Sequence, residues 1–168
     1  MIWILLLISI GIVSGYYFWP DAKLPKHARI DKIVVYKSVR KMQVFEHAKF
    51  LKTYKIALGK NPVGHKQQEG DNKTPEGFYV IESRNANSQF HKNLGISYPN
   101  ASDKKYAISI GKPAGGDIKI HGLRNGKGRR GKFHRWKNWT AGCIAVTNPE
   151  MDELFDRVTD NCQIEIRA

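Results

Sequence analysis

The first 19 residues form an apolar run without a charged side chain. Residues 2–13 are mostly Ile, Leu and Val, and an aromatic cluster occupies residues 16–19. The run approaches the roughly 20 residues that a membrane-spanning helix needs, and aromatic residues favour the headgroup level. We expect residues 1–19 to form an uncleaved signal anchor. A signal peptide cleaved near Ser14 and Gly15 is the alternative, whereas a buried core helix is disfavoured because the run has no polar face.

Beyond a polar linker at residues 20–29, the pattern changes to short segments that are rich in β-branched and aromatic residues. Such segments, bounded by clusters of Gly, Pro, Asn and Asp, are typical of β-strands. The pattern predicts strands at residues 30–37, 41–46, 50–58, 77–82, 106–110, 117–120 and 162–166. Residues 59–73 and 84–104 are expected to be irregular, and residues 122–139 to form a basic, glycine-rich loop.

One α-helix is predicted near the C-terminus. Asn148 is expected to cap it, with Pro149 in the first turn and Glu150 close to the positive end of the helix dipole. Its apolar face consists of Met151, Leu154, Phe155 and Val158. Residues 30–168 are therefore expected to form one mostly β domain with one main α-helix, preceded by the membrane helix.

The charge of the chain predicts an anionic partner. The 168 residues suit one domain with its own core, and 28 Lys+Arg against 15 Asp+Glu give a net charge of +13. Nucleic acid, an anionic membrane surface and an acidic polymer would each fit this charge. The sequence has no aromatic stacking motif and no recognition-helix pattern, so a nucleic-acid partner is not expected.

Two residues stand where side chains reach an open site. His121 ends a predicted strand, and Cys143 follows Gly142 after the glycine-rich loop. An imidazole can lower the pKa of a thiol and move its proton, and a glycine turn can leave amide N–H groups free for an oxyanion. The residues alone leave two interpretations open: a nucleophilic Cys–His pair, or a structural thiol and a hydrogen-bonded histidine.

The order of motifs resembles the L,D-transpeptidase (YkuD-type) domain, whose catalytic signature is His-Gly, then Ser/Thr-x-Gly-Cys, then Asn. The matching residues here are His121, Gly122, Thr140, Gly142, Cys143 and Asn148. Upstream, residues 70–77 are similar to the family's G-D-x-x-T-P-x-G segment, and residues 96–100 to another stretch seen in members. The resemblance covers roughly residues 31–167, and several motifs in the same order make it specific.

The resemblance implies a β-sandwich or barrel-like catalytic fold and acyl transfer on peptidoglycan. Cys143 would attack a stem tetrapeptide to form a thioester, and His121 would serve as base and then as acid. An amine acceptor would resolve the thioester, which gives a 3→3 cross-link or attaches a wall protein. Gly142, Gly122 and Thr140 are implied to support the site or the oxyanion.

The second cysteine, Cys162, is expected to be a small buried residue in the closing strand. A disulfide to Cys143 would disable the enzyme and is not expected, and two cysteines are too few for a disulfide scaffold. No set of ligands has zinc-like spacing, so no metal or other cofactor is predicted.

The loop before Cys143 departs from the commonest form of the family. The spacing from His121 is 22 positions, and the additional residues are basic. They include Lys127, Arg129, Arg130, Lys132 and Arg135. The possible substrate-binding residues are His134, Arg130, Arg135 and Trp139.

Two other functions stay open. A hydrolase or L,D-carboxypeptidase would use the same cysteine with water in place of the amine, because acceptor choice depends on the shape of the groove. A basic cell-wall-binding protein is the non-enzyme alternative, and it would leave His121 and Cys143 unexplained.

The implied partner, peptidoglycan stem peptides, sets the expected location. We expect the domain in the cell envelope, on the periplasmic side and tethered to the inner membrane through residues 1–19. The positive-inside rule opposes this orientation, because basic residues follow the run. These residues are Lys23, Lys26, Arg29 and Lys32. The functional argument takes precedence, since a domain in the cytoplasm would not meet its substrate.

Overall fold

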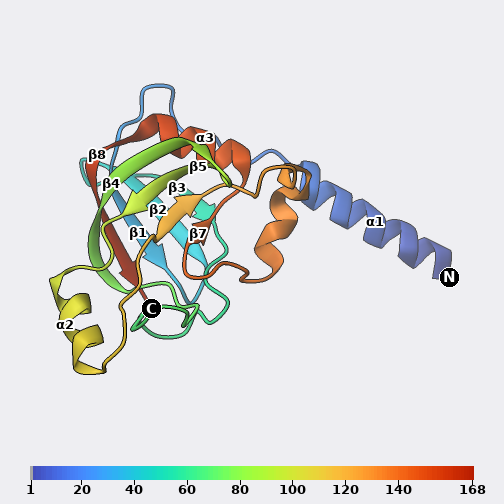
Figure 1. The fold of residues 1–168 in the computed structure, drawn as a ribbon. Coiled ribbons are helices and arrows are strands. Elements are labelled where there is room, and N and C mark those ends of the chain that lie inside the picture. The colour runs from blue at the N-terminus through green and yellow to red at the C-terminus, as the bar shows by residue number, and fades with distance from the viewer. Residues whose placement is uncertain (1) are drawn as a thin grey trace.

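The computed structural model describes residues 2–168, so that Met1, the first residue of the expected anchor, lies outside the described residues. A strongly curled sheet forms the body of the molecule, and one long helix projects from its side (Figure 1). The N-terminus lies at the far end of that helix, and the C-terminus lies beside the body.

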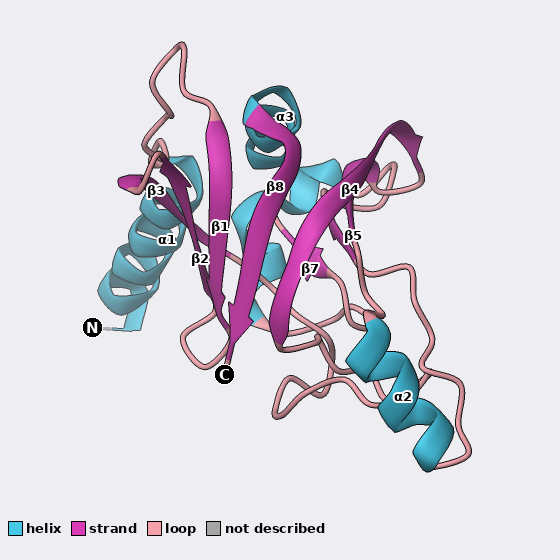
Figure 2. Cartoon of the chain, turned by 90° about the vertical axis from the view of Figure 1, so that its left-hand side faces the viewer, coloured by secondary structure: helices cyan, strands magenta, loops and turns pink. Residues whose placement is uncertain are grey.

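Within residues 2–168, eight strands form one sheet in the order β3-β2-β1-β8-β4-β5-β6-β7. Their bounds are β1 (Ile30–Tyr36), β2 (Lys41–Glu46), β3 (Lys49–Lys55), β4 (Gly77–Ser88), β5 (His91–Ile96), β6 (Lys119–His121), β7 (Ile144–Ala145) and β8 (Val158–Arg167). The pairs β1–β8 and β6–β7 are parallel, and the others are antiparallel. Figure 2 shows β1, β8 and β4 side by side. The closing strand of the sequence therefore lies in the middle of the sheet.

The sheet curls until its two ends meet. The chain continues past β3, and Ala57 forms an antiparallel bridge with Ala145 of β7, while Gly59 forms a parallel bridge with Thr140. Closure of this kind removes a free sheet edge and encloses an apolar interior. The mostly β, barrel-like fold that the sequence and its resemblance predicted is confirmed.

The interior is filled by the inward-facing residues of the strands and by one helix, α3 (Asn148–Arg157). Met151 and Leu154 of α3 are fully buried, as the 3.6-residue period of its apolar face requires. The largest buried strand residues include Ile30, Ile33, Met42, Tyr54, Leu94, Ile120 and Ile144.

The cap of α3 differs from the prediction. Thr147, not Asn148, is the N-cap, and the Glu150 carboxylate accepts hydrogen bonds from the Thr147 amide at 3.0 Å and hydroxyl at 2.7 Å. Asn148 is used elsewhere, because its side-chain oxygen accepts a hydrogen bond from the Leu123 amide at 2.8 Å. Threonine and asparagine are both good caps, and a tertiary contact decided between them.

The region around residues 84–120 differs most from the sequence prediction. β4 extends to Ser88 and pairs with β5, although residues 84–104 were expected to be irregular. Residues 106–110 were predicted as a strand, but α2 (Ala101–Ser109) runs through most of them and stands away from the sheet in Figure 2. Asn100 and Asp103 cap α2 reciprocally, and this local signal overrides the weak strand propensity of the isoleucines that follow.

Besides α2, one further helical segment was not expected. The basic loop contains η1 (Gly128–Trp136), a 3₁₀ segment in two pieces that meet at Gly131. The apolar run forms α1 (Ile2–Phe18), and none of its side chains is buried. Among the described residues, no helix has the length and apolarity needed to cross a membrane.

A buried ion pair joins η1 to α3. A guanidinium nitrogen of Arg135 lies 2.6 Å from a carboxylate oxygen of Glu150, and each side chain is only 6% exposed. Loss of one partner from such a pair leaves the other charge buried and unpaired. Arg135 therefore stabilises the fold.

We predict that Arg135→Ala lowers the free energy of unfolding by about 3 kcal/mol, because the Glu150 carboxylate would lose its cation. Urea denaturation followed by circular dichroism measures the change. Arg129→Ala is the matched control, since Arg129 is exposed in the same segment. Equal losses in the two variants would contradict a structural role for the pair.

Candidate active site

The parallel pairing of β6 and β7 places His121 and Cys143 on one face of the sheet. Ile120 is paired with Ile144, and His121 with Ala145. Both isoleucines point into the core with no exposed surface. Because side chains alternate along a strand, the residues on either side of them point the other way. His121 and Cys143 both line a cavity of about 790 Å³ on that face.

His121 is held in one tautomer by the backbone. Its Nδ1 lies 2.7 Å from the carbonyl oxygen of Gly122, which can only accept, so Nδ1 carries the proton and Nε2 has a free lone pair. The ring packs against Phe90, with centroids 4.8 Å apart, and against Trp139, at 5.6 Å, and these two rings also contact each other. Burial lowers the pKa of His121 despite the Gly122 hydrogen bond. The side chain is therefore a neutral base at pH 7.

Cys143 is half-buried, and its thiol donates to the carbonyl oxygen of Asp117 at 3.6 Å. Burial raises the pKa of the Cys143 thiol, and a hydrogen bond from the Lys119 backbone only partly opposes this effect. The described contacts include no hydrogen bond between Cys143 and His121. At rest the site thus holds a thiol and a neutral imidazole rather than a thiolate–imidazolium pair.

A threonine fixes the shape of the cysteine loop. The Thr140 hydroxyl donates to the Cys143 carbonyl at 2.7 Å and accepts from the Gly142 amide at 3.2 Å. Gly142 has φ +139°, and a Cβ atom there would lie 2.7 Å from the carbonyl oxygen of Lys73. Only glycine fits this conformation and this contact.

The Lys73 contact explains what the segment at residues 70–77 does. The Asp71 carboxylate accepts hydrogen bonds from the Lys66 ammonium and from three backbone amides, so it ties the turn together. The hydroxyl of Thr74 accepts from the Gly59 amide at 3.1 Å. The segment is a rigid support behind Cys143.

Asn148 and the other glycine of the signature hold the histidine side of the site. A Cβ atom on Gly122 would lie 2.8 Å from the Asn148 side-chain oxygen, which is the atom that binds the Leu123 amide. Asn148 thereby fixes the chain immediately after His121. Its role in the signature is tertiary rather than helix capping.

Of the four residues that were expected to bind substrate, two line the cavity and two do not. Arg130 and Trp139 line the cavity. His134 is buried behind Trp139, whose indole N–H points to its Nδ1 at 3.5 Å, and burial lowers the pKa of His134 to about 3. Arg135 is bound to Glu150 and is absent from the described cavity wall.

Several cavity residues were missed by the sequence analysis. Lys119 and Arg124 line the cavity beside Lys127 and Arg130 of the predicted basic loop, and Phe90 covers His121. The alternation of β6 could have identified Lys119, two positions before His121. Nothing in the local pattern marks Phe90, since a hairpin turn between β4 and β5 carries it there.

Both cysteines are free thiols, and Cys162 is buried in β8, as predicted. Within residues 2–168, no group of three or more His, Cys, Asp or Glu side chains is arranged to hold a metal ion.

We predict that the rate of Cys143 alkylation by iodoacetamide keeps rising beyond about pH 8.5, the usual pKa of a free thiol. Burial raises the thiol pKa, and below that pKa the thiolate fraction increases about tenfold per pH unit. Mass spectrometry of the labelled protein, in a Cys162→Ala background that removes the second thiol, gives the profile. A plateau reached below about pH 7 would instead indicate a thiolate–imidazolium pair.

Comparisons with known proteins agree with this site. A family model described as the L,D-transpeptidase catalytic domain, YkuD, matches residues 30–166. An Escherichia coli K12 protein provisionally named L,D-transpeptidase YafK is 30% identical over 133 residues, which cover 76% of this chain and 46% of YafK.

Solved structures resemble the chain as well. A variant of Pgp2, a helical cell shape determining protein of Campylobacter jejuni, superposes with a TM-score of 0.63 at 25% identity, over 91% of this chain and 52% of Pgp2. Bd1075 of Bdellovibrio bacteriovorus gives 0.56 at 26% identity, over 84% and 48%. The chain spans about half the length of these relatives. By the family model and by its relatives, the chain belongs to the L,D-transpeptidase (YkuD) catalytic domain family.

Proposed function

We propose that the chain is a peptidoglycan L,D-transpeptidase in which Cys143 is the nucleophile and His121 the general base and acid. The observation that carries the proposal is the shared cavity: a thiol and a neutral imidazole with a free Nε2 lie on one face of paired strands. Membership of the family supports the class of reaction.

The first half-reaction forms a thioester. The thiol turns from the Asp117 carbonyl and gives its proton to Nε2 of His121, while sulfur attacks the carbonyl carbon of the third residue of a stem tetrapeptide. The tetrahedral intermediate then expels the amine of the terminal D-alanine, which takes the proton from the imidazolium. A neutral thiol and imidazole at rest suit this order of steps, because the proton moves to His121 as the sulfur attacks.

The second half-reaction releases the acyl group. An acceptor amine attacks the thioester carbon and gives a proton to His121, which returns it to the departing sulfur. The product is a new amide, and the thiol is restored. Water in place of the amine would give hydrolysis by the same route.

The oxyanion of the tetrahedral intermediate needs a hydrogen-bond donor on the loop that carries Cys143. The Gly142 amide is already bound by Thr140, so we assign this role to the amide of Cys143 itself. Thr140 acts by holding the loop. The stem peptide carries carboxylates, and the cationic cavity wall suits them: Lys119, Arg124, Lys127 and Arg130.

The substrate places the proposed enzyme in the cell envelope. Attachment to the inner membrane through residues 1–19 stays a prediction of the apolar run. The exposed side chains of α1 are compatible with insertion into an apolar environment.

We predict that Cys143→Ala lowers turnover of tetrapeptide muropeptides by at least about 1,000-fold, because covalent chemistry needs the thiol. Mass spectrometry of products separates the outcomes. Loss of D-alanine with gain of an amine acceptor indicates transpeptidation, and loss of D-alanine alone indicates hydrolysis. Cys162→Ala is the control and should retain turnover. Near wild-type turnover in Cys143→Ala would refute the proposal.

The cavity cations generate a second prediction. Replacing Arg124, Lys127 and Arg130 together by Gln should raise KM for muropeptides roughly tenfold, at about 0.5 kcal/mol for each exposed charge. Iodoacetamide should label Cys143 at an unchanged rate, since it carries no charge.

A matched triple variant removes the same charge from a distant surface, at Lys104, Lys105 and Lys112 on and beside α2. Its KM should stay near wild type. Equal increases in the two triple variants would mean that net charge, rather than the cavity wall, governs binding.

A further inference from the structure

The C-terminal end of α1 docks onto η1. The Tyr17 ring stacks on Phe133 with centroids 4.9 Å apart and an interplanar angle of 24°. The Tyr17 hydroxyl donates to the Arg129 carbonyl at 2.7 Å. At the kink of η1, a Cβ atom on Gly131 would lie 2.9 Å from the Tyr17 ring, and the residue has φ +46°. Glycine at the kink lets the tyrosine lie directly against the backbone.

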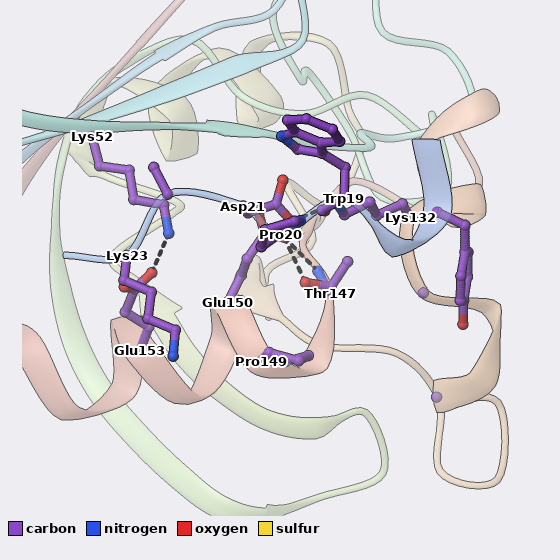
Figure 3. Close-up of a pocket in the computed structure, with 14 residues that line it drawn as sticks. Trp19, Pro20, Asp21, Lys23, Lys52, Lys132, Thr147, Pro149, Glu150 and Glu153 are labelled. Carbon is purple, nitrogen blue, oxygen red and sulfur yellow. Dashed lines mark hydrogen bonds and ion pairs between the residues drawn. The ribbon is translucent and has the colours of Figure 1, made fainter. Parts of the chain in front are cut away.

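The chain after α1 continues the same contact, as Figure 3 shows. The Lys132 ammonium donates to the Trp19 carbonyl and lies 3.3 Å from the Asp21 carboxylate. Farther on, the Leu24 amide donates to the Glu153 carboxylate of α3 at 2.6 Å. Residues 17–24 are thus fastened to η1 and α3.

These residues also border a cavity of about 520 Å³ beside α3. Its carboxylates are already paired: Asp21 with Lys132, Glu150 with Arg135, and Glu153 with Lys52. The cavity therefore has no free carboxylate to recruit a cation, and its walls belong to the docking of the N-terminal segment.

The opposite side of η1 belongs to the active site. Arg130 lines the catalytic cavity, and His134 contacts Trp139, whose ring packs on His121. A 3₁₀ segment has poorer internal hydrogen bonds than an α-helix and so depends more on outside contacts. One short segment therefore joins the end of α1 to the wall of the catalytic cavity.

We infer that Tyr17 is a positioning residue for the active site: it braces η1, so that loss of the Tyr17–Phe133 stack loosens residues 128–136 and weakens substrate binding. The expected effect of Tyr17 on substrate binding rests on the proposed function, whereas its expected effect on the stability of η1 does not. The brace follows Ser14 and Gly15, so it would remain with the domain even if the apolar run were cleaved there.

Hydrogen exchange in the full chain, held in detergent micelles, tests the brace without any need for turnover. In Tyr17→Ala, the amides of residues 128–136 should exchange at least about tenfold faster. Tyr17→Phe keeps the stacked ring and should stay within about threefold of wild type. Tyr106→Ala, on an exposed ring of α2, is the matched control for Tyr17→Ala. Unchanged exchange in Tyr17→Ala would overturn the inference.

Kinetics provides the second readout. Tyr17→Ala should raise KM for muropeptides about fivefold or more with kcat within about twofold, and Tyr17→Phe should restore it. Iodoacetamide labelling of Cys143 should stay within about twofold. A fall in kcat alone would overturn the positioning role. If even the wild-type chain gave no product, the proposed function would fail, and the exchange result would still decide the brace.

Discussion

The arrangement of this protein depends on a contact between backbones in which no side chain intervenes. A Cβ atom on Gly59 would lie 2.1 Å from the Asn72 carbonyl oxygen and 3.1 Å from the Gly142 Cα, and Gly142 itself meets the Lys73 carbonyl. Three segments meet here: the chain after β3, the turn at residues 70–77 and, much farther along the sequence, the loop before β7. Their contact closes the curled sheet and sets the position of Cys143.

The electrostatics of the site follow from the packing around β6 and β7. These two strands pair, Phe90 and Trp139 pack against His121, and the resulting burial favours the neutral forms of both imidazole and thiol. The positive charge of the cavity comes instead from exposed side chains on its rim. In the proposed reaction, a neutral thiol and imidazole below a cationic rim would bind an anionic peptide without first separating charge at Cys143.

The basic insertion before Cys143 has two sides with different chemistry. Arg135 forms a buried ion pair with Glu150, and Lys132 donates a hydrogen bond to the Trp19 carbonyl. Arg130, by contrast, lines the cavity. Counting basic residues therefore overstates how many of them can meet a substrate. Within η1, Arg130 lines the cavity that holds His121 and Cys143, whereas Phe133 and the Arg129 carbonyl contact Tyr17 of α1.

The sequence by itself determined the local features that have a short-range cause. Alternating apolar residues indicated most strands, the apolar period of α3 indicated its buried face, and the order of motifs singled out His121 and Cys143 before any contact was visible. It also indicated the uniformly apolar character of residues 2–13. The cap Asn100 with Asp103 was equally local, and its signal was outweighed in the prediction by the isoleucines nearby.

Only the tertiary structure decided features that depend on partners distant in the chain. It moved Asn148 from helix cap to a hydrogen bond with the Leu123 amide, assigned Thr147 to the cap, and buried Arg135 against Glu150. It brought Phe90 to His121 through the β4–β5 hairpin, of which the sequence predicted only the apolar first half of β4. The physical reason is common to all four: propensity and period act within a few residues, whereas burial and hydrogen-bond choice depend on which segments the closed sheet brings together.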